Sequence, residues 1–175
     1  VPKSSEPEPE IEDTIHGGAD AGTDTIRIDN QITIVVSNDL TRMTAVEVLA
    51  GAGTNLSHSI VIDDDTTRGS LTQIDLSGTT GSSSNALVNL TGLAQGMIVK
   101  GTSGADEIVG GSGADTITGG LGIDTLDGGD GSDVYVYAQS TDFVSNAGSA
   151  VRDLVSDSGA TGTDTVEVTG PITIE

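Results

Sequence analysis

Four aspartates recur at nine-residue intervals between positions 101 and 136, and each belongs to a tandem nonapeptide. The units are GTSGADEIV, GGSGADTIT, GGLGIDTLD and GGDGSDVYV. Each unit has glycine at positions 1 and 4, aspartate at position 6 and an apolar residue at position 8. The aspartates are Asp106, Asp115, Asp124 and Asp133, and the apolar residues are Ile108, Ile117, Leu126 and Tyr135. Carboxylates spaced in this way are candidate oxygen ligands for a hard cation.

The two halves of a unit suit different backbone conformations. The glycine-rich half tolerates positive φ, so it predicts a tight turn with exposed carbonyl groups. The last three residues, such as Thr116–Thr118, predict a short strand with one inward side chain. Two units then form one coil of a parallel roll with a turn on each edge. Turns from alternate units stack, which brings Asp106 toward Asp124 and Asp115 toward Asp133.

The stacked aspartates need a counter-ion. Two carboxylates about 5 Å apart repel by about 3 kcal/mol at an effective dielectric of about 20. Residues 101–136 contain seven acids and no lysine or arginine. The available donors are carboxylates and turn carbonyls, a set that favours Ca²⁺ over Zn²⁺ or Cu²⁺. The alternative, a flexible linker rich in glycine and aspartate, does not explain an apolar residue at every eighth position.

The repeat resembles the RTX (repeats in toxin, hemolysin-type) family of calcium-binding β-rolls. It departs from the family pattern at position 2 of the first unit, where Thr102 replaces glycine. In that family the earlier turn gives the carbonyls of positions 2 and 4 and its aspartate. The turn 18 residues later gives the carbonyls of positions 1 and 3 and its aspartate. The resemblance implies one site from Thr102, Gly104, Asp106, Gly119, Leu121 and Asp124, and another from Gly111, Gly113, Asp115, Gly128, Asp130 and Asp133.

Composition restricts the remaining possibilities. Apolar residues make up 34% of the 175 residues, and Tyr135, Tyr137 and Phe143 are the only aromatics. This composition favours a thin, elongated core, as in solenoids. The net charge of −21 argues against nucleic acid and anionic membranes as direct partners. The chain has no cysteine and no apolar stretch long enough for a transmembrane segment.

The flanking segments suggest four regions. Residues 1–10 contain three of the four prolines and predict a linker. Residues 11–100 contain short β-branched runs separated by turn residues, which predict strands of a parallel solenoid or, alternatively, a sandwich. Leu90 and Val99 fall in frame with position 8 of the repeats, whereas Met97 replaces the aspartate of a calcium site. The repeats occupy 101–136, and 137–175 would contain a capping segment, with Tyr135 and Tyr137 beside the open end, and the start of a next repeat.

A longer repeat supports this last prediction. Residues 22–34 (GTDTIRIDNQITI) resemble residues 162–174 (GTDTVEVTGPITI) at an offset of 140. Similarity by chance between two threonine-rich strands is the alternative. We interpret the match as a tandem array. Relatives leave the cell by type I secretion with an extreme C-terminal signal, which this sequence lacks, and its N-terminus has no secretory signal. We therefore expect it to be part of a longer protein.

Some other polar residues are weaker candidates. Asp13, Asp20 and Asp24 lie in repeat-like fragments interrupted by an insertion, and could form an isolated calcium site. Asp63, Asp64 and Asp65 could hold another ion or form an exposed turn. His58 lies between two serines, but no nucleophile motif accompanies it, and we expect a surface histidine.

These patterns predict a protein without catalytic activity. Its fold class is all-β, a parallel β-roll or β-solenoid with RTX coils. The pattern of short strands around the repeats resembles that of RTX-bearing surface-layer and adhesin proteins. The resemblance implies an extracellular or bacterial cell-surface module that folds on Ca²⁺ binding. Expected partners are calcium ions, neighbouring copies of the protein or cell-surface polysaccharide. The alternatives are the RTX folding and secretion domain of a type I-secreted enzyme, such as a protease or lipase, and a glycan-binding adhesin domain.

Overall fold

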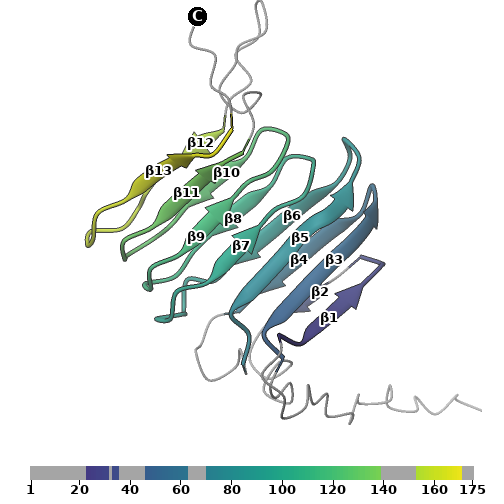
Figure 1. The fold of residues 1–175 in the computed structure, drawn as a ribbon, viewed down its shortest axis with the longest axis horizontal. Coiled ribbons are helices and arrows are strands. Elements are labelled where there is room, and N and C mark those ends of the chain that lie inside the picture. The colour runs from purple at the N-terminus through teal and green to yellow at the C-terminus, as the bar shows by residue number, and fades with distance from the viewer. Residues whose placement is uncertain (1–22, 32, 36–45, 63–69, 139–152, 171–175) are drawn as a thin grey trace, which may run out of the picture.

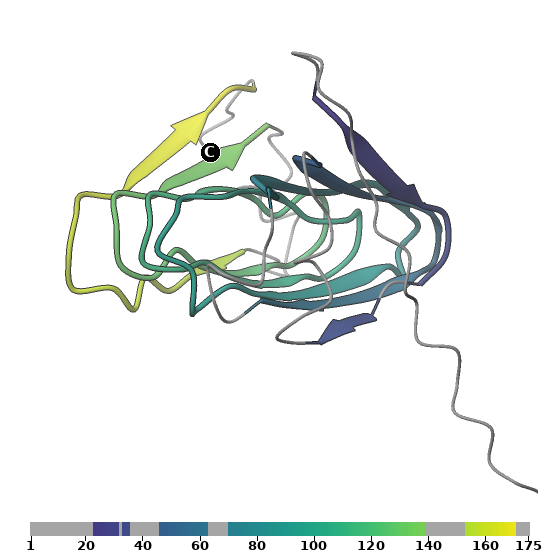
Figure 2. The same ribbon diagram turned by 90° about the horizontal axis from the view of Figure 1, so that it is seen from below.

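The structure is a computed structural model that describes residues 23–31, 33–35, 46–62, 70–138 and 153–170. Its strands form two parallel sheets, joined at both edges by turns (Figures 1 and 2). The seven-stranded sheet has the order β1-β3-β5-β7-β9-β11-β13. Its strands are β1 (Thr25–Ile28), β3 (Val48–Thr54), β5 (Gln73–Thr80), β7 (Ile98–Lys100), β9 (Thr116–Thr118), β11 (Val134–Tyr137) and β13 (Thr165–Val168).

The six-stranded sheet has the order β12-β10-β8-β6-β4-β2. Its strands are β2 (Thr33–Val35), β4 (Ser57–Val61), β6 (Asn85–Asn89), β8 (Glu107–Val109), β10 (Thr125–Asp127) and β12 (Leu154–Val155). Successive strands therefore alternate between the sheets, and the chain advances by one coil with every two strands. This arrangement confirms the predicted all-β parallel roll and excludes the sandwich for the described part of residues 31–100.

Two rows of register-matched side chains run through the core between the sheets, and further buried apolar residues such as Leu71, Leu76, Leu93 and Met97 pack around them. In the seven-stranded sheet one row follows the strand register from β1 to β13, through Ile26, Leu49, Ile74, Val99, Ile117, Tyr135 and Val166. In the six-stranded sheet Ile60, Val88, Ile108, Leu126 and Val155 pair in the same way. In β8, β9 and β10 each strand buries a single apolar side chain, which explains how this part of a chain with so few large residues forms a core.

The nonapeptides form the strands that were predicted from them. In β8, β9 and β10 the middle residue is buried, and in β11 Tyr135 takes the corresponding place. Val99 aligns with Ile117, as its frame predicted. Leu90 is buried in the core, so the core extends backward as predicted, but its register differs: Val88 aligns with Ile108, and Leu90 lies beyond the end of β6. The connection from β6 to β7 is longer than a nonapeptide turn, which shifts the frame by two residues.

The end of the roll also differs from the prediction. Tyr135 and Tyr137 are buried in the core, and β13 lies beyond β11, so these tyrosines do not cover an open end. Val166 of β13 is 54% exposed, whereas Ile117 of β9 is fully buried. Both sheets run from the strands before residue 100 into the nonapeptide strands, as expected for one continuous solenoid. Among the described residues no helix is long and apolar enough to cross a membrane.

Candidate metal centre

The nonapeptide turns lie on the two edges of the roll, as their alternation predicted. Turn 1 (residues 101–106) joins β7 to β8 and turn 3 (119–124) joins β9 to β10, and we call this side the first edge. Turn 2 (110–115) joins β8 to β9 and turn 4 (128–133) joins β10 to β11, on the second edge. Another connection on the second edge, turn 5 (156–164), joins β12 to β13.

Aspartates on the first edge form a ladder in which each carboxylate reaches back by one coil. The Ala86 N–H donates to Asp106 Oδ1 at 2.6 Å, and the Asp106 N–H donates to Asp124 Oδ1 at 2.9 Å. The Asp124 N–H donates in turn to Asp153 Oδ1 at 2.9 Å. Each carboxylate thus fixes the start of the strand in the preceding coil by a charge-assisted hydrogen bond.

The second edge has the same ladder. The Met97 N–H donates to Asp115 Oδ1 and the Asp115 N–H to Asp133 Oδ1, both at 2.7 Å. The Asp133 N–H donates to Asp164 Oδ1 at 3.0 Å. The structure therefore brings together Asp106 with Asp124 and Asp115 with Asp133, the two pairs expected from the sequence.

Asp153 and Asp164 are additional members of the ladders that the sequence argument missed. They lie 29 and 31 residues after their partners, whereas the nonapeptide pairs lie 18 residues apart. A signal for Asp164 is present in residues 159–167 (GATGTDTVE), which have glycine, glycine, aspartate and valine at positions 1, 4, 6 and 8.

The hydrogen-bond partner of the second carboxylate oxygen, Oδ2, differs from turn to turn. Asp106 Oδ2 accepts from the Thr102 N–H at 2.6 Å, and Asp115 Oδ2 accepts from the Gly111 N–H at 2.8 Å. In turn 4 the equivalent Gly129 N–H donates to Asp127 Oδ1 instead. Asp133 Oδ2 is buried and has no hydrogen-bond partner among the described residues.

Carbonyl oxygens of each turn in a pair lie close against glycines of the other turn. The carbonyls of Thr102 and Gly104 face the glycines at positions 2 and 4 of turn 3, and those of Gly111 and Gly113 face the same positions of turn 4. The carbonyls of Gly119 and Gly128 face back toward position 1 of the earlier turns. The absence of a Cβ at these glycines permits the close approach. The Leu121 and Asp130 carbonyls remain predicted ligands.

Burial of the aspartates opposes their ionisation in the metal-free chain. It raises the pKa of Asp106 and of Asp115 to about 6, although hydrogen bonds from backbone N–H groups act in the opposite direction. Burial also raises the pKa of Asp133, and the negative charges of Asp164 and Asp127 raise it further. A bound cation would remove this penalty, because it replaces water as the partner of the charged form.

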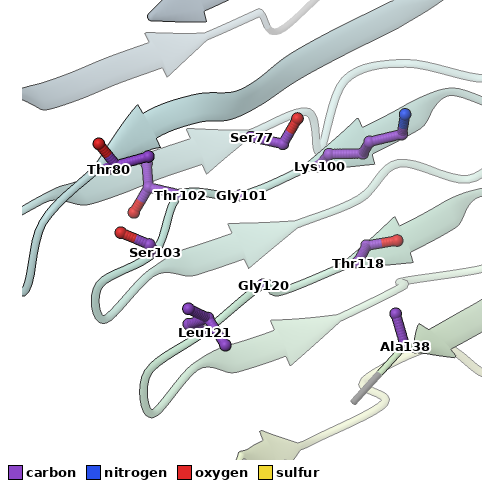
Figure 3. Close-up of a pocket in the computed structure, with 10 residues that line it drawn as sticks. All are labelled: Ser77, Thr80, Lys100, Gly101, Thr102, Ser103, Thr118, Gly120, Leu121 and Ala138. Atoms are coloured by element: carbon purple, nitrogen blue, oxygen red, sulfur yellow. The ribbon is translucent and has the colours of Figure 1, made fainter. Parts of the chain in front are cut away.

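The basic residue nearest in sequence to the turns does not neutralise them. Lys100 ends β7 directly before turn 1, and its Nζ lies 3.1 Å from Asp75 Oδ2. In Figure 3 the Lys100 side chain extends away from Thr102 and Ser103. A hollow of about 290 Å³ lies beside it. The hollow is lined by Ser77, Thr80, Lys100, Gly101, Thr102, Ser103, Thr118, Gly120, Leu121 and Ala138. Lys100 therefore does not neutralise the aspartates of the turns, and another cation must do so.

These observations fit calcium. The donors at each turn pair are carboxylates and carbonyls, which are hard oxygen ligands, and the partnerless Asp133 Oδ2 requires a proton or a cation. No group of three acidic or histidine side chains within the described residues gathers to hold a metal, so backbone carbonyls must complete the coordination. Bound between the two turns of a pair, each calcium ion would join two adjacent coils at one edge of the roll.

The remaining candidates are less informative. The Asp24 N–H donates to Glu47 Oε2 at 2.9 Å, which repeats the ladder contact with a glutamate. Asp13, Asp20 and Asp63–65 lie outside the described residues. The expectation of a surface histidine is wrong for His58, because its side chain points into the roll, where Nε2 lies 2.8 Å from Thr79 Oγ1. Burial lowers the pKa of His58.

Comparison with known proteins supports the metal assignment. Residues 100–135 match the family model of the RTX calcium-binding nonapeptide repeat, in four copies. Comparison with curated proteins and with solved structures gave no match. The matched segment is therefore an array of RTX calcium-binding repeats, and its ion is Ca²⁺. Turn 5 and the strand-rich region before residue 100 lie outside the match.

Proposed function

We propose that this chain is a non-enzymatic, calcium-dependent structural and assembly module of a secreted or cell-surface protein of the surface-layer or adhesin type. The observation that carries the proposal is the pair of aspartate ladders, which stack buried carboxylates along both edges of the roll. Without cations these carboxylates oppose winding of the coils. With calcium the same carboxylates hold adjacent coils together, so ion binding acts as the folding switch.

The place of the long repeat supports an assembly role. The two similar segments contain β1 and β13, which lie at opposite ends of the same sheet (Figure 1). The offset of 140 residues therefore corresponds to the length of the roll between β1 and β13. We infer that tandem copies would continue one roll, with β13 in the position that β1 has in the following copy. This arrangement favours a surface array over the alternative, a folding and secretion domain of a type I-secreted enzyme.

Calcium availability supports a role outside the cell. Extracellular modules bind calcium with dissociation constants of about 0.1–1 mM. Free calcium in the cytosol is far below this range, so the roll would remain incompletely wound until export. Folding after export is a useful property for a structural module, because assembly then begins only where calcium is abundant.

Substitution of a single aspartate tests the pairing of the turns. We expect Asp124→Ala to weaken calcium binding at the first edge by about tenfold or more, because it removes one of the two carboxylates there. Binding between turns 2 and 4 should remain, because Asp124 is not part of that pair. Isothermal titration calorimetry measures the two classes of site.

The control is Asp29→Asn, which removes an exposed negative charge paired with Arg27, far from the turns. It should leave both affinities unchanged. Equal calcium affinity and stoichiometry in Asp124→Ala and in the unmodified chain would contradict the turn pairing.

Calcium affinity should also fall with pH. The carboxyls of Asp106 and Asp115 have pKa values of about 6 in the metal-free chain, so calcium competes with protons below that pH. Between about pH 7.5 and about pH 5, each site should lose about tenfold in affinity, since about nine in ten of these carboxyls become protonated. Titrations at several pH values measure the effect, and constant affinity across the range would argue against carboxylate ligands.

A further inference from the structure

Turn 5 continues the second edge beyond the four nonapeptides. It stacks on turn 4 as turn 4 stacks on turn 2: the Asp133 N–H donates to Asp164 Oδ1 at 3.0 Å, and the Asp115 N–H donates to Asp133 Oδ1 at 2.7 Å. The strand register also continues, since Tyr135 pairs with Val166 as Ile117 pairs with Tyr135. Asp164 therefore occupies the same place in the coil as the aspartates of the repeats.

The carbonyl oxygens of turn 4 lie against turn 5 as those of turn 2 lie against turn 4. The Gly129 carbonyl faces Gly159, and the Gly131 carbonyl faces Gly162, which has φ of +100°. In the preceding pair the Gly111 carbonyl faces Gly129, and that of Gly113 faces Gly131. Two residues separate Gly159 from Gly162, whereas only one separates Gly129 from Gly131. Both glycines of turn 5 nevertheless retain these contacts.

A buried carboxylate oxygen at this junction lacks a partner. Asp133 is fully buried, and its Oδ2 has no hydrogen bond among the described residues. Its counterpart in turn 2, Asp115 Oδ2, accepts from the Gly111 N–H, but Asp127 accepts the equivalent bond in turn 4. A buried charged oxygen left unsatisfied is strongly unfavourable, so the junction requires a positive partner.

Two further carboxyls lie on the open side of the junction. Asp157 and Asp164 lie within hydrogen-bonding reach of each other. The negative charge of Asp164 acts on Asp133, and that of Asp157 acts on Tyr135, which lies close to Asp133 in the chain. Both are exposed, so an ion can reach this position from solvent. The described acids form no closed cluster of three side chains, and the turn 4 carbonyls are needed as ligands.

We propose that turns 4 and 5 hold an additional calcium ion between them, with the carboxylates of Asp133 and Asp164 and the carbonyls of Gly129 and Gly131 as ligands, and with Asp157 as a nearby negative charge that strengthens binding. The inference rests on the proposed function, in which the turns bind calcium. It extends that function to a turn outside the matched repeats, 31 residues along the chain from its partner. The ion would fix β12 and β13 to the rest of the roll, so that the last coil closes only in calcium.

Counting bound ions in the full chain by native mass spectrometry, together with calorimetric titration, tests this site. Asp164→Asn keeps the shape of the side chain and an oxygen that can accept the Asp133 N–H, but removes the charge. We expect it to bind one calcium ion fewer than the unmodified chain, or to bind that ion at least about tenfold more weakly. The matched control is Glu167→Gln, which removes an exposed charge from the same strand and should change neither quantity.

Two further measurements complete the test. Asp157→Asn, at an exposed position that does not affect the core, should weaken the same ion without altering the circular dichroism of the metal-free chain. Tyr135 lies beneath turn 4, where its hydroxyl accepts the Gly128 N–H at 2.6 Å, so it should sensitise the luminescence of Tb³⁺ bound at the second edge. The Asp164→Asn variant should lose one phase of this signal.

The outcomes separate the two proposals. If the unmodified chain binds no calcium, both the proposed function and the additional site are wrong. If it binds calcium but Asp164→Asn and Asp157→Asn retain the full number of ions and the same affinities, only the additional site is wrong. Loss of one ion in the Asp164→Asn variant, with none lost in the Glu167→Gln variant, supports it.

Discussion

Adding calcium to the EGTA-treated chain should raise its free energy of unfolding by about 3 kcal/mol when free calcium is about ten times the dissociation constant at both RTX turn pairs. Each occupied site contributes about 1.4 kcal/mol by mass action alone. Calcium should stabilise the chain because the aspartates are buried. Burial raises the pKa of Asp106 and Asp115, so their charged forms are unfavourable without a cation. Calcium restores the charged forms and links adjacent coils.

Circular dichroism and chemical denaturation in EGTA and in calcium measure this effect. We expect β-type signal to appear or strengthen with calcium, and the denaturation midpoint to rise. Magnesium at equal concentration is the control, because it requires near-octahedral geometry and gives up its waters reluctantly, so it should stabilise the chain much less. Identical spectra and midpoints in EGTA and in calcium would refute calcium-dependent winding.

The nonapeptides show why much of this fold is predictable from sequence. A strict period of nine residues determines the turn, the strand and the inward side chain together, so Ile117 and Leu126 could be placed before the structure was known. Irregular connections break this regularity. The frame predicted Leu90 opposite Ile108, but the longer connection between β6 and β7 places Val88 there.

The missed members of the ladders have a related cause. Asp164 pairs with Asp133 across 31 residues, and residues 138–152 intervene between the last nonapeptide strand and the resumption of the ladder at Asp153. A search restricted to 18-residue spacing cannot find such a partner. Parallel stacking can, because the strand register brings together any two segments that occupy successive coils, whatever the length of chain between them.

The ladder also connects the long repeat with the metal sites. Asp164 corresponds to Asp24 at the offset of 140 residues, and the Asp24 N–H donates to Glu47 Oε2 in the next coil. The Asp164 carboxylate accepts from the Asp133 N–H in the preceding coil. In a continuous array one aspartate would make both contacts, which places a ladder residue at each junction between copies. Calcium bound near Asp164 would then stabilise the junction as well as the coil.

Replacement of a glycine at position 4 should damage both the fold and one calcium site. Gly122 in turn 3 has φ of +122°, which L-residues rarely adopt. A Cβ there would lie 2.6 Å from the carbonyl carbon of Gly104 and closer still to its oxygen. These atoms belong to the backbone of the adjacent coil and cannot rotate away as a side chain would. We expect Gly122→Ala to destabilise the chain by about 3 kcal/mol or more.

The same substitution should weaken calcium binding at the first edge, because the displaced Gly104 carbonyl is one of the predicted ligands. Leu121→Ala is the matched control at the adjacent position. The Leu121 side chain is 40% exposed, and only its carbonyl is a predicted ligand. The variant should therefore retain its calcium affinity and lose less than about 1 kcal/mol of stability. Denaturation and calcium titration of both variants measure these effects. If Gly122→Ala is as stable as Leu121→Ala and binds calcium equally well, then the carbonyl of Gly104 does not depend on close packing between the turns, and the coordination inferred for the first edge is wrong.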